Sequence, residues 1–179
     1  MTDLTIAIPT YNRSKRLQKC LSDLFNQILE SGFFEKIEVL ISDNASEDDT
    51  FYVINSSEEL YSKNNIKFKH ISNPINLGFG ENVKKCYECA EGKYVWFLSD
   101  DDNLYAESIK FVLDRIENEK PNTLFFNFNQ TPYNNNNPRI KEEVFLPYIS
   151  NLNSKQLRTF TNWPKLSACV IKKYPAKPI

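Results

Sequence analysis

Histidine, glycine and cysteine are scarce in this sequence, and each shortage excludes a class of site. His70 is the only histidine among 179 residues, which disfavours a Ser-His-Asp triad and a histidine-rich zinc site. The four glycines form neither a G-x-G-x-x-G nor a G-x-x-x-x-G-K-[ST] motif, which disfavours a dinucleotide site and a P-loop. Four scattered cysteines do not make a disulfide framework, so we expect reduced thiols. Cys86 and Cys89 form an isolated C-x-x-C, which we interpret as helix packing.

Strong net charge and long apolar runs are also lacking. The formal net charge is −1, whereas a general nucleic-acid binder is usually basic, so we expect no nucleic-acid partner. No apolar run approaches the roughly 18 residues that a membrane span needs, and the first residues do not resemble a signal peptide. These features predict a cytoplasmic protein of about one domain.

The spacing of apolar residues predicts alternating strands and helices. Strands are expected at 4–9, 37–41, 66–71, 94–98 and 123–128, and helices at 17–28, 80–90 and 106–119. Ser46, which precedes three acidic residues, is expected to cap one more helix between the second and third strands. Four alternations of strand and helix predict an α/β fold with a mostly parallel sheet flanked by helices.

A polar cluster follows each of the first four predicted strands. The clusters are Thr10 to Arg13, Asp43 to Ser46, Asn76 to Gly80, and Asp100 to Asp102. In parallel sheets, ligands bind beyond the carboxyl ends of the strands, so we expect the four clusters to gather at one edge. That convergence favours a functional role for these residues.

The three consecutive carboxylates Asp100, Asp101 and Asp102 have two interpretations. They repel one another, so they lie either in a solvated turn before a helix or around a cation that neutralises them. Hard divalent ions prefer oxygen ligands. Together with the cation at Arg13 and the acid at Asp43, a metal at this edge would suit a nucleoside diphosphate, whose oxygens the metal would bridge.

Four stretches in order resemble the signatures of family 2 glycosyltransferases with the Rossmann-like GT-A fold. They are Leu4 to Arg13, Val39 to Thr50, Asn76 to Gly78, and Gly92 to Asn103, and they cover roughly the first 120 residues. The resemblance implies transfer of a sugar from a nucleotide donor, most often a UDP-sugar, to a saccharide or lipid-linked acceptor. It also implies Mg²⁺ or Mn²⁺ and inversion at the anomeric carbon. The Ser-Asp-Asp-Asp sequence looks most like enzymes that build surface polysaccharides.

The resemblance also implies roles for individual residues. Asp43 would hold the base edge, and Asn76 and Gly78 would shape the third loop. Ser99 replaces the first Asp of the family's acidic motif, so the resemblance places Asp100 on the ribose and Asp101 and Asp102 on the metal. Four residues after the first strand would line the nucleotide and its phosphates: Pro9, Thr10, Tyr11 and Arg13.

The end of the chain departs from the family pattern. The resemblance implies a general base after the acidic motif, but from Val144 to Ile179 there is no Asp or Glu. Either the sequence is an incomplete enzyme, which we expect, or the base lies elsewhere. We therefore predict a nucleotide-sugar-binding core at 1–130 and the start of an acceptor-side region at 131–179. Six cations give the acid-free segment a charge of about +6, namely Lys155, Arg158, Lys165, Lys172, Lys173 and Lys177.

These departures leave alternatives open for the basic segment and for the function. The basic segment either contacts an anionic acceptor at the inner membrane leaflet or pairs with acidic sequence further along the chain. The missing base leaves a binding module without chemistry as an alternative to the transferase. A nucleotidyltransferase is the third possibility, but it would normally carry a glycine-rich loop where this chain has Pro-Thr-Tyr-Asn-Arg.

Overall fold

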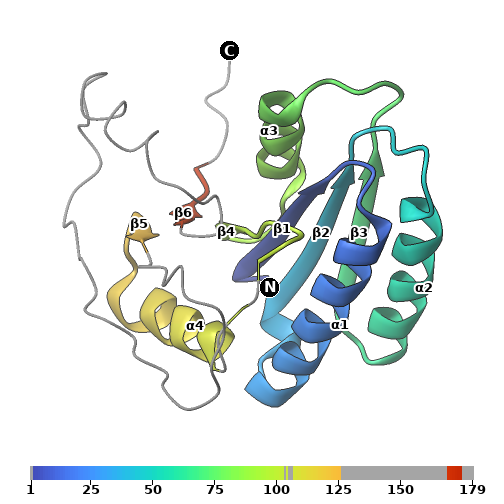
Figure 1. Cartoon of the computed structure of the whole chain (residues 1–179). Helices are drawn as coiled ribbons and strands as arrows, with labels where there is room; N and C mark the ends of the chain where they lie inside the picture. The colour runs from blue at the N-terminus through green and yellow to red at the C-terminus, as the bar shows by residue number, and fades with distance from the viewer. Residues whose placement is uncertain (1, 103, 105–106, 126–168, 175–179) are drawn as a thin grey trace.

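The computed structural model describes residues 2–102, 104, 107–125 and 169–174, and its core is one six-stranded sheet (Figure 1). The strand order is β3-β2-β1-β4-β6-β5. The elements in chain order are β1 (Leu4–Thr10), α1 (Ser14–Ser31), η1 (Phe34–Lys36), β2 (Ile37–Asp43), α2 (Thr50–Lys63), β3 (Lys67–Ser72), α3 (Phe79–Cys89), β4 (Tyr94–Phe97), α4 (Ser108–Glu119), β5 (Thr123–Phe125) and β6 (Cys169–Lys172).

The first four strands of the sheet run parallel, as predicted. β1 lies between β2 and β4 and is paired with both, which places Thr10 beside Asp43 at the carboxyl end. β6 runs antiparallel to both β4 and β5. The segment predicted as the acceptor-side region therefore contributes a strand to the core sheet, while the predicted boundary near residue 130 lies outside the described residues.

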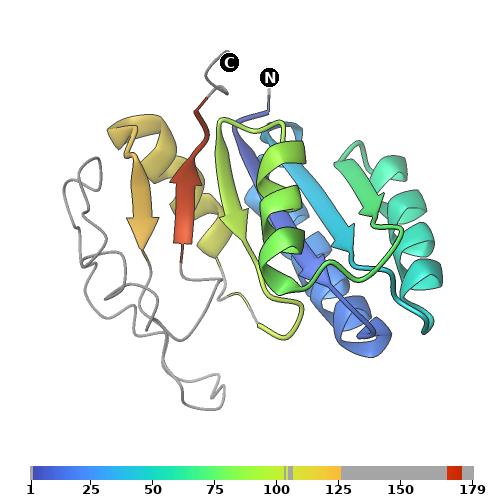
Figure 2. The same cartoon turned by 90° about the horizontal axis from the view of Figure 1, so that it is seen from above.

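Helices cover both faces of the sheet. Leu4, Ile6 and Ile8 of β1 point to one face, where they are buried in one apolar cluster with side chains of α1, α2 and α4. Ala7 points to the opposite face and packs with Cys86 of α3. Figures 1 and 2 show α3 on the side of the sheet opposite α1 and α2. The buried Cys86 confirms that the C-x-x-C belongs to helix packing.

Two predicted helix boundaries had different outcomes. Gly32 ends α1 in the left-handed conformation, as expected for a glycine after the last apolar position. The prediction that Ser46 caps the next helix is wrong, because α2 begins at Thr50. Ser46 instead donates its hydroxyl to Asp43 Oδ1 over 2.5 Å. The backbone N–H of Thr50 donates to Asp48.

A buried polar contact holds the opposite end of the sheet. Glu38 is fully buried and accepts hydrogen bonds from the Thr5 hydroxyl at 2.6 Å and from Glu91 N at 2.8 Å. Gly92 lies against this pair, and a Cβ there would be 2.5 Å from Thr5 N. Only glycine therefore allows the chain to enter β4 at this point.

Among the described residues, no helix is long and apolar enough to cross a membrane.

Candidate functional site

The loops that follow β1, β2, β3 and β4 meet at one edge of the sheet. Asn44 N donates to Thr10 O at 3.0 Å, and Asn73 N donates to Asp43 O at 2.8 Å, so the chain stays paired as each strand ends. Leu98 N continues the β4 pairing by donating to Ala7 O at 2.9 Å. The predicted gathering of the four polar clusters is thus a feature of the fold.

Asp100 is the buried centre of the junction between β1 and β4. Its carboxylate is only 3% exposed and accepts hydrogen bonds from Thr10 Oγ1 at 2.9 Å and from Arg13 Nη1 at 2.8 Å. The hydrogen bond and charge of Asp100 raise the pKa of Arg13 above its ordinary value. Since Asp100 already has a hydroxyl and a guanidinium, it is a rigid part of the site.

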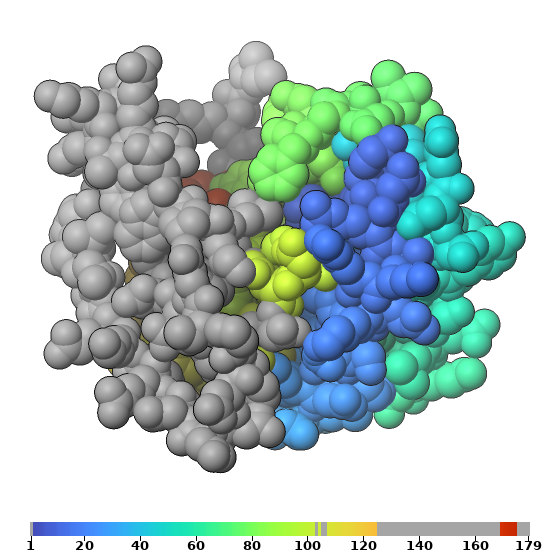
Figure 3. Space-filling view, viewed as in Figure 1, coloured from blue at the N-terminus to red at the C-terminus, as the bar shows by residue number. Residues whose placement is uncertain are grey.

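Asp101 lies at the surface of the same loop, with its side chain 43% exposed. Ser99 Oγ donates to its Oδ1 at 2.6 Å, and Oδ2 faces Arg13 Nη1 at 3.4 Å and Arg16 Nη1 at 3.3 Å. Asp102 is mostly buried, at 8% exposure. Figure 3 shows the yellow-green segment after β4 at the surface beside the blue β1–α1 segment.

The chemistry of these carboxylates fits a divalent cation. No group of three or more His, Cys, Asp or Glu converges on a metal position within the described residues. Mg²⁺, however, is usually held by one or two carboxylates together with substrate phosphates, so two Asp side chains suffice. Asp101, which combines a carboxylate with access to solvent, is the donor best placed to receive an ion.

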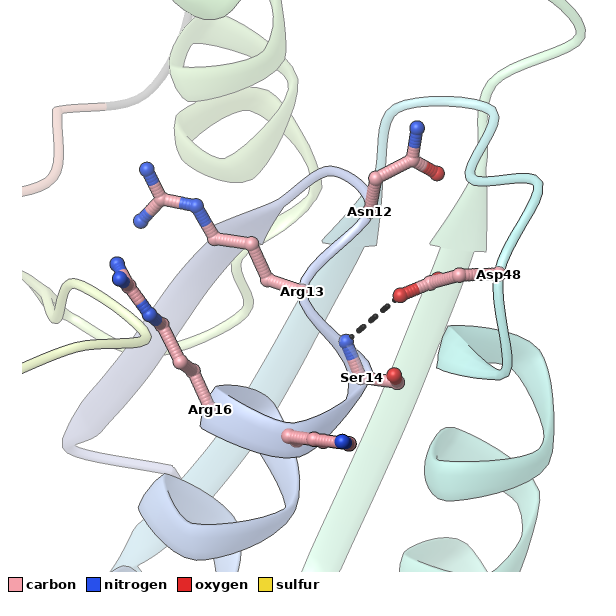
Figure 4. Close-up of a pocket in the computed structure, with 6 residues that line it drawn as sticks. Asn12, Arg13, Ser14, Arg16 and Asp48 are labelled. Carbon is pink, nitrogen blue, oxygen red and sulfur yellow. Dashed lines mark hydrogen bonds between the residues drawn. The ribbon is translucent and has the colours of Figure 1, made fainter.

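The loop after β1 is tied to the loop after β2 by reciprocal hydrogen bonds. Asn12 N donates to Ser46 Oγ at 2.8 Å, and Glu47 N donates to Asn12 Oδ1 at 2.7 Å. Asp48 Oδ2 accepts from Ser14 N at 3.0 Å, where α1 begins (Figure 4). These contacts fix the direction in which α1 leaves the sheet edge.

Asp48 serves the first turns of two helices. Besides Ser14 N, it accepts hydrogen bonds from the backbone N–H and the hydroxyl of Thr50 at the start of α2. Burial acts to raise the pKa of Asp48, but the hydrogen bonds from Thr50 and Ser14 outweigh it and lower the pKa to about 2. The acids after Ser46 were expected to support one helix, and Asp48 supports two.

Asp43 is the last residue of β2, and Tyr11 directly follows the last residue of β1. Asp43 is 5% exposed, and its Oδ1 accepts both the backbone N–H and the hydroxyl of Ser46. Within the described residues, its Oδ2 receives no hydrogen bond. Tyr11 is 40% exposed, whereas Pro9 and Thr10 are buried in β1. Tyr11 therefore presents a ring surface, while Pro9 and Thr10 shape the site from beneath.

A network of amide side chains fixes the loop after β3. Asn44 Nδ2 donates to Asn76 Oδ1 at 2.7 Å, and Asn44 Oδ1 accepts from Leu77 N at 3.0 Å. Asn76 Oδ1 also accepts from Gly78 N at 2.9 Å. Gly78 has φ +82°, a conformation that glycine adopts without strain, and it stands directly before α3. Asn76 and Gly78 thus shape this loop through their own contacts.

Two buried asparagines in this network were not singled out from the sequence. Asn73 Nδ2 donates to both Asn44 Oδ1 and Asn82 Oδ1, at 3.1 and 3.0 Å. Asn82 Oδ1 also accepts from Ser42 Oγ at 2.6 Å, and its Nδ2 donates to Ser42 O. The only available signal was Asn82 on the otherwise apolar face of its helix, where a buried amide needs partners.

A hollow of about 470 Å³ opens at the start of α1. Its lining consists of Asn12, Arg13, Ser14, Lys15, Arg16 and Asp48. In Figure 4, Arg13 and Arg16 extend from the helix start in the same direction, away from Asp48. The hollow therefore has a strongly basic side, adjacent to the acidic loop after β4.

The acid-free segment is described only at its last strand and the two residues that follow. Lys173 Nζ donates to the carbonyls of Glu88 and Ala90 at the end of α3, where the helix dipole favours a cation. Lys172 Nζ lies 5.9 Å from the ring centroid of Tyr174. The other four cations of the segment lie outside the described residues, and membrane contact stays a prediction.

A family model described as glycosyl transferase family 2 matches residues 5–172. The chain belongs to this family. The abequosyltransferase RfbV of Salmonella typhimurium is 33% identical over 116 residues, which are 65% of this chain and 33% of that protein. The chain spans about a third of the length of RfbV and smaller shares of longer curated relatives, such as 11% of the chondroitin synthase of Pasteurella multocida.

Solved structures show the same fold as this family 2 chain. The crystal structure of residues 1–349 of S. aureus TarS in complex with UDP-GlcNAc matches with a TM-score of 0.68 and 23% identity, covering 96% of this chain and 46% of that one. The mannosyltransferase PcManGT from Pyrobaculum calidifontis, in complex with GDP-Man and Mn²⁺, matches with a TM-score of 0.62 and 16% identity, covering 70% of this chain and 35% of that one. The predicted GT-A fold is confirmed.

Proposed function

We propose that this chain binds the donor in a glycosyltransferase that moves a sugar from a nucleoside diphosphate to a hydroxyl of a saccharide or lipid-linked acceptor. The observation that carries the proposal is the junction at Asp100, where Thr10 and Arg13 join the acidic loop to the end of β1. A basic hollow and the exposed carboxylate of Asp101 meet there at the ligand edge of a GT-A sheet. Membership of family 2 gives the reaction class.

The base and ribose would lie over the ends of β1 and β2. Asp43 Oδ2 can accept a ring N–H, and an unpaired acceptor of this kind rejects a base that lacks the donor. Tyr11 offers an exposed ring for stacking. Asp100, held by Thr10 and Arg13, would present its carboxylate toward the ribose. A uridine nucleotide meets these requirements, because uracil carries an imino N–H.

The diphosphate would lie between the start of α1 and the loop after β4. Arg13 and the N–H groups of the first helical turn provide positive charge on one side. Asp101 and Asp102 would hold Mg²⁺ or Mn²⁺ on the other side. When bound, the metal neutralises the negative charge that develops on the nucleoside diphosphate as it leaves. Mn²⁺ in the PcManGT complex supports a metal of this kind in the fold.

The acceptor hydroxyl would attack the anomeric carbon from the face opposite the diphosphate, giving inversion. That geometry requires a base for the hydroxyl proton. No residue of this chain is assigned to the role, since the segment from Val144 to Ile179 has no carboxylate. Donor binding is therefore the role that the described residues support, and transfer needs a base in addition.

Isothermal calorimetry of the chain with UDP tests the proposal. We expect binding in the presence of Mn²⁺ or Mg²⁺ and a loss of at least tenfold in affinity in excess chelator, because the metal neutralises both Asp101 and the diphosphate. Asp101→Ala should reduce the metal-dependent part. Equal affinity with and without metal, or no loss in Asp101→Ala, would remove the metal from the proposal; no UDP binding under any condition would overturn the proposal itself.

A further inference from the structure

The start of α1 carries the wrong charge for a helix N-terminus. Arg13 stands directly before the helix, Lys15 and Arg16 lie in its first turn, and no acidic residue is there. The helix dipole places partial positive charge at this end, so cations are unfavourable and acids are preferred. Cations in the first turn of a helix oppose this preference, and such departures from local preference are expected at functional sites.

Acids from other loops compensate for these cations. Asp48 reaches Ser14 N from the loop after β2. Asp101 Oδ2, from the loop after β4, lies 3.3 Å from Arg16 Nη1 and 3.4 Å from Arg13 Nη1. Asp101 is also the carboxylate proposed to receive the metal. A guanidinium and a divalent cation compete for the same oxygen, because each draws on the same negative charge.

The two arginines differ in how firmly they are held. Arg13 lies 2.8 Å from Asp100, whose carboxylate is 3% exposed, so moving Arg13 would leave a buried charge unpaired. Among the described residues, the ion pair of Arg16 is with the exposed Asp101, and the Arg16 side chain is itself 60% exposed. An exposed ion pair at this distance is weak and exchanges readily. Arg16 is therefore the cation that can leave.

We propose that Arg16 exchanges between two anions: it neutralises Asp101 in the metal-free protein and binds the diphosphate of the donor once a metal takes Asp101. The inference rests on the proposed function and adds a phosphate-binding residue to it. A guanidinium suits both positions, since its donors match carboxylate and phosphate oxygens alike. The exchange keeps Asp101 neutralised before the metal arrives and supplies a cation to the diphosphate afterwards.

The substitution Arg16→Gln tests the exchange, because it should change the affinities for Mn²⁺ and for UDP in opposite directions. Without nucleotide, we expect Mn²⁺ to bind about two- to fivefold more tightly, because its competitor on Asp101 is gone. With saturating Mn²⁺, we expect UDP to bind about five- to tenfold more weakly, because the diphosphate loses a cation. Uridine, which has no phosphate, should bind unchanged. Calorimetry measures the affinities for UDP and uridine, and the electron paramagnetic resonance signal of free Mn²⁺ measures the metal affinity.

Lys15→Gln is the matched control. Lys15 lies one residue away, lines the same hollow, carries the same charge and makes no ion pair within the described part of the chain, so its loss removes a charge from the hollow without freeing Asp101. Equal shifts in Mn²⁺ and UDP affinity in the two variants would overturn the exchange in favour of general electrostatics. The exchange would also be overturned if Arg16→Gln did not tighten Mn²⁺ binding or did not weaken UDP binding. If the unaltered chain binds no UDP, the proposed function fails, and the Mn²⁺ measurement alone still tests whether Arg16 competes for Asp101.

Discussion

Arg13 and Asp100, 87 residues apart in the sequence, form an ion pair with 2.8 Å between Nη1 and Oδ1. The pair joins the loop after β1 to the loop after β4, and the carboxylate is buried while the guanidinium reaches the surface. A charge-assisted bond with one buried partner fixes the spacing between the two loops. The basic side of the hollow and the acidic loop depend on this contact for their relative positions.

Arg13→Gln should destabilise the fold and weaken donor binding together. Asp100 would stay buried without its cation, and we expect the free energy of unfolding to fall by about 1–3 kcal/mol. This value is smaller than that for a fully buried pair, because Arg13 is partly exposed to solvent. Urea denaturation measures this loss. Lys15→Gln, which removes the same charge without an ion pair, should change stability by less than about 0.5 kcal/mol. Equal stability in both variants would contradict the role of the ion pair.

Asp48 predicts a pH dependence of stability. Its pKa is lowered to about 2 in the folded chain, so the unfolded state binds its proton first as the pH falls. The contribution of Asp48 is fully present above its ordinary pKa and is lost as the pH falls toward 2. The difference in unfolding free energy between the unaltered chain and Asp48→Asn should therefore be largest near pH 6 and shrink below about pH 4. Urea titrations at several pH values would show it; a difference independent of pH would argue against the hydrogen bonds to Ser14 and Thr50.

Asp43→Ala tests the predicted contact with the base. We expect at least a tenfold loss of uridine affinity, with or without metal, because the ring N–H would lose its acceptor. Ser46→Ala is the control, since it removes a hydroxyl partner of Asp43 and leaves the carboxylate in place. If Asp43→Ala alters thermal stability alone and leaves uridine affinity intact, Asp43 is structural.

Asn82→Ala should loosen the loop after β3. The substitution leaves the Ser42 hydroxyl and one Asn73 donor without their buried partner, at an expected cost of about 1–3 kcal/mol in unfolding free energy. Hydrogen exchange at Leu77 and Gly78 should accelerate, because Asn73 loses one of the two partners that orient its amide toward Asn44. Asn118→Ala on α4 is the control, as its amide is exposed. Unchanged exchange at both loop positions would show that the network does not set the loop.

The sequence was informative wherever a signal is local. Apolar periodicity predicts α1 and the first strands, and the end of each strand marks where polar residues gather at the edge. Gly32 at the end of α1 and the three consecutive Asp residues after β4 are also local features of the sequence. The ribose-binding role of Asp100 stays a prediction, while the structure shows its carboxylate buried against Thr10 and Arg13.

Contacts between distant residues could not be predicted. Ser46 has the local pattern of a helix cap, but its hydroxyl pairs with Asp43 and Asn12 instead, so a tertiary contact overrides the local preference. Asn73 and Asn82 resemble ordinary loop and helix residues until the fold brings them together. The antiparallel pairing of β6 with β4 depends on a connection whose course is not evident from hydrophobic spacing.

A crystal structure of the chain with UDP and Mn²⁺, with anomalous scattering measured at the manganese edge, tests the central claim most directly. The proposal predicts one anomalous peak within about 2.5 Å of an Asp101 or Asp102 oxygen, with the diphosphate on the same ion and the uracil N–H on Asp43. Manganese bound away from the loop after β4, or UDP bound away from the carboxyl ends of β1 and β2, would contradict it.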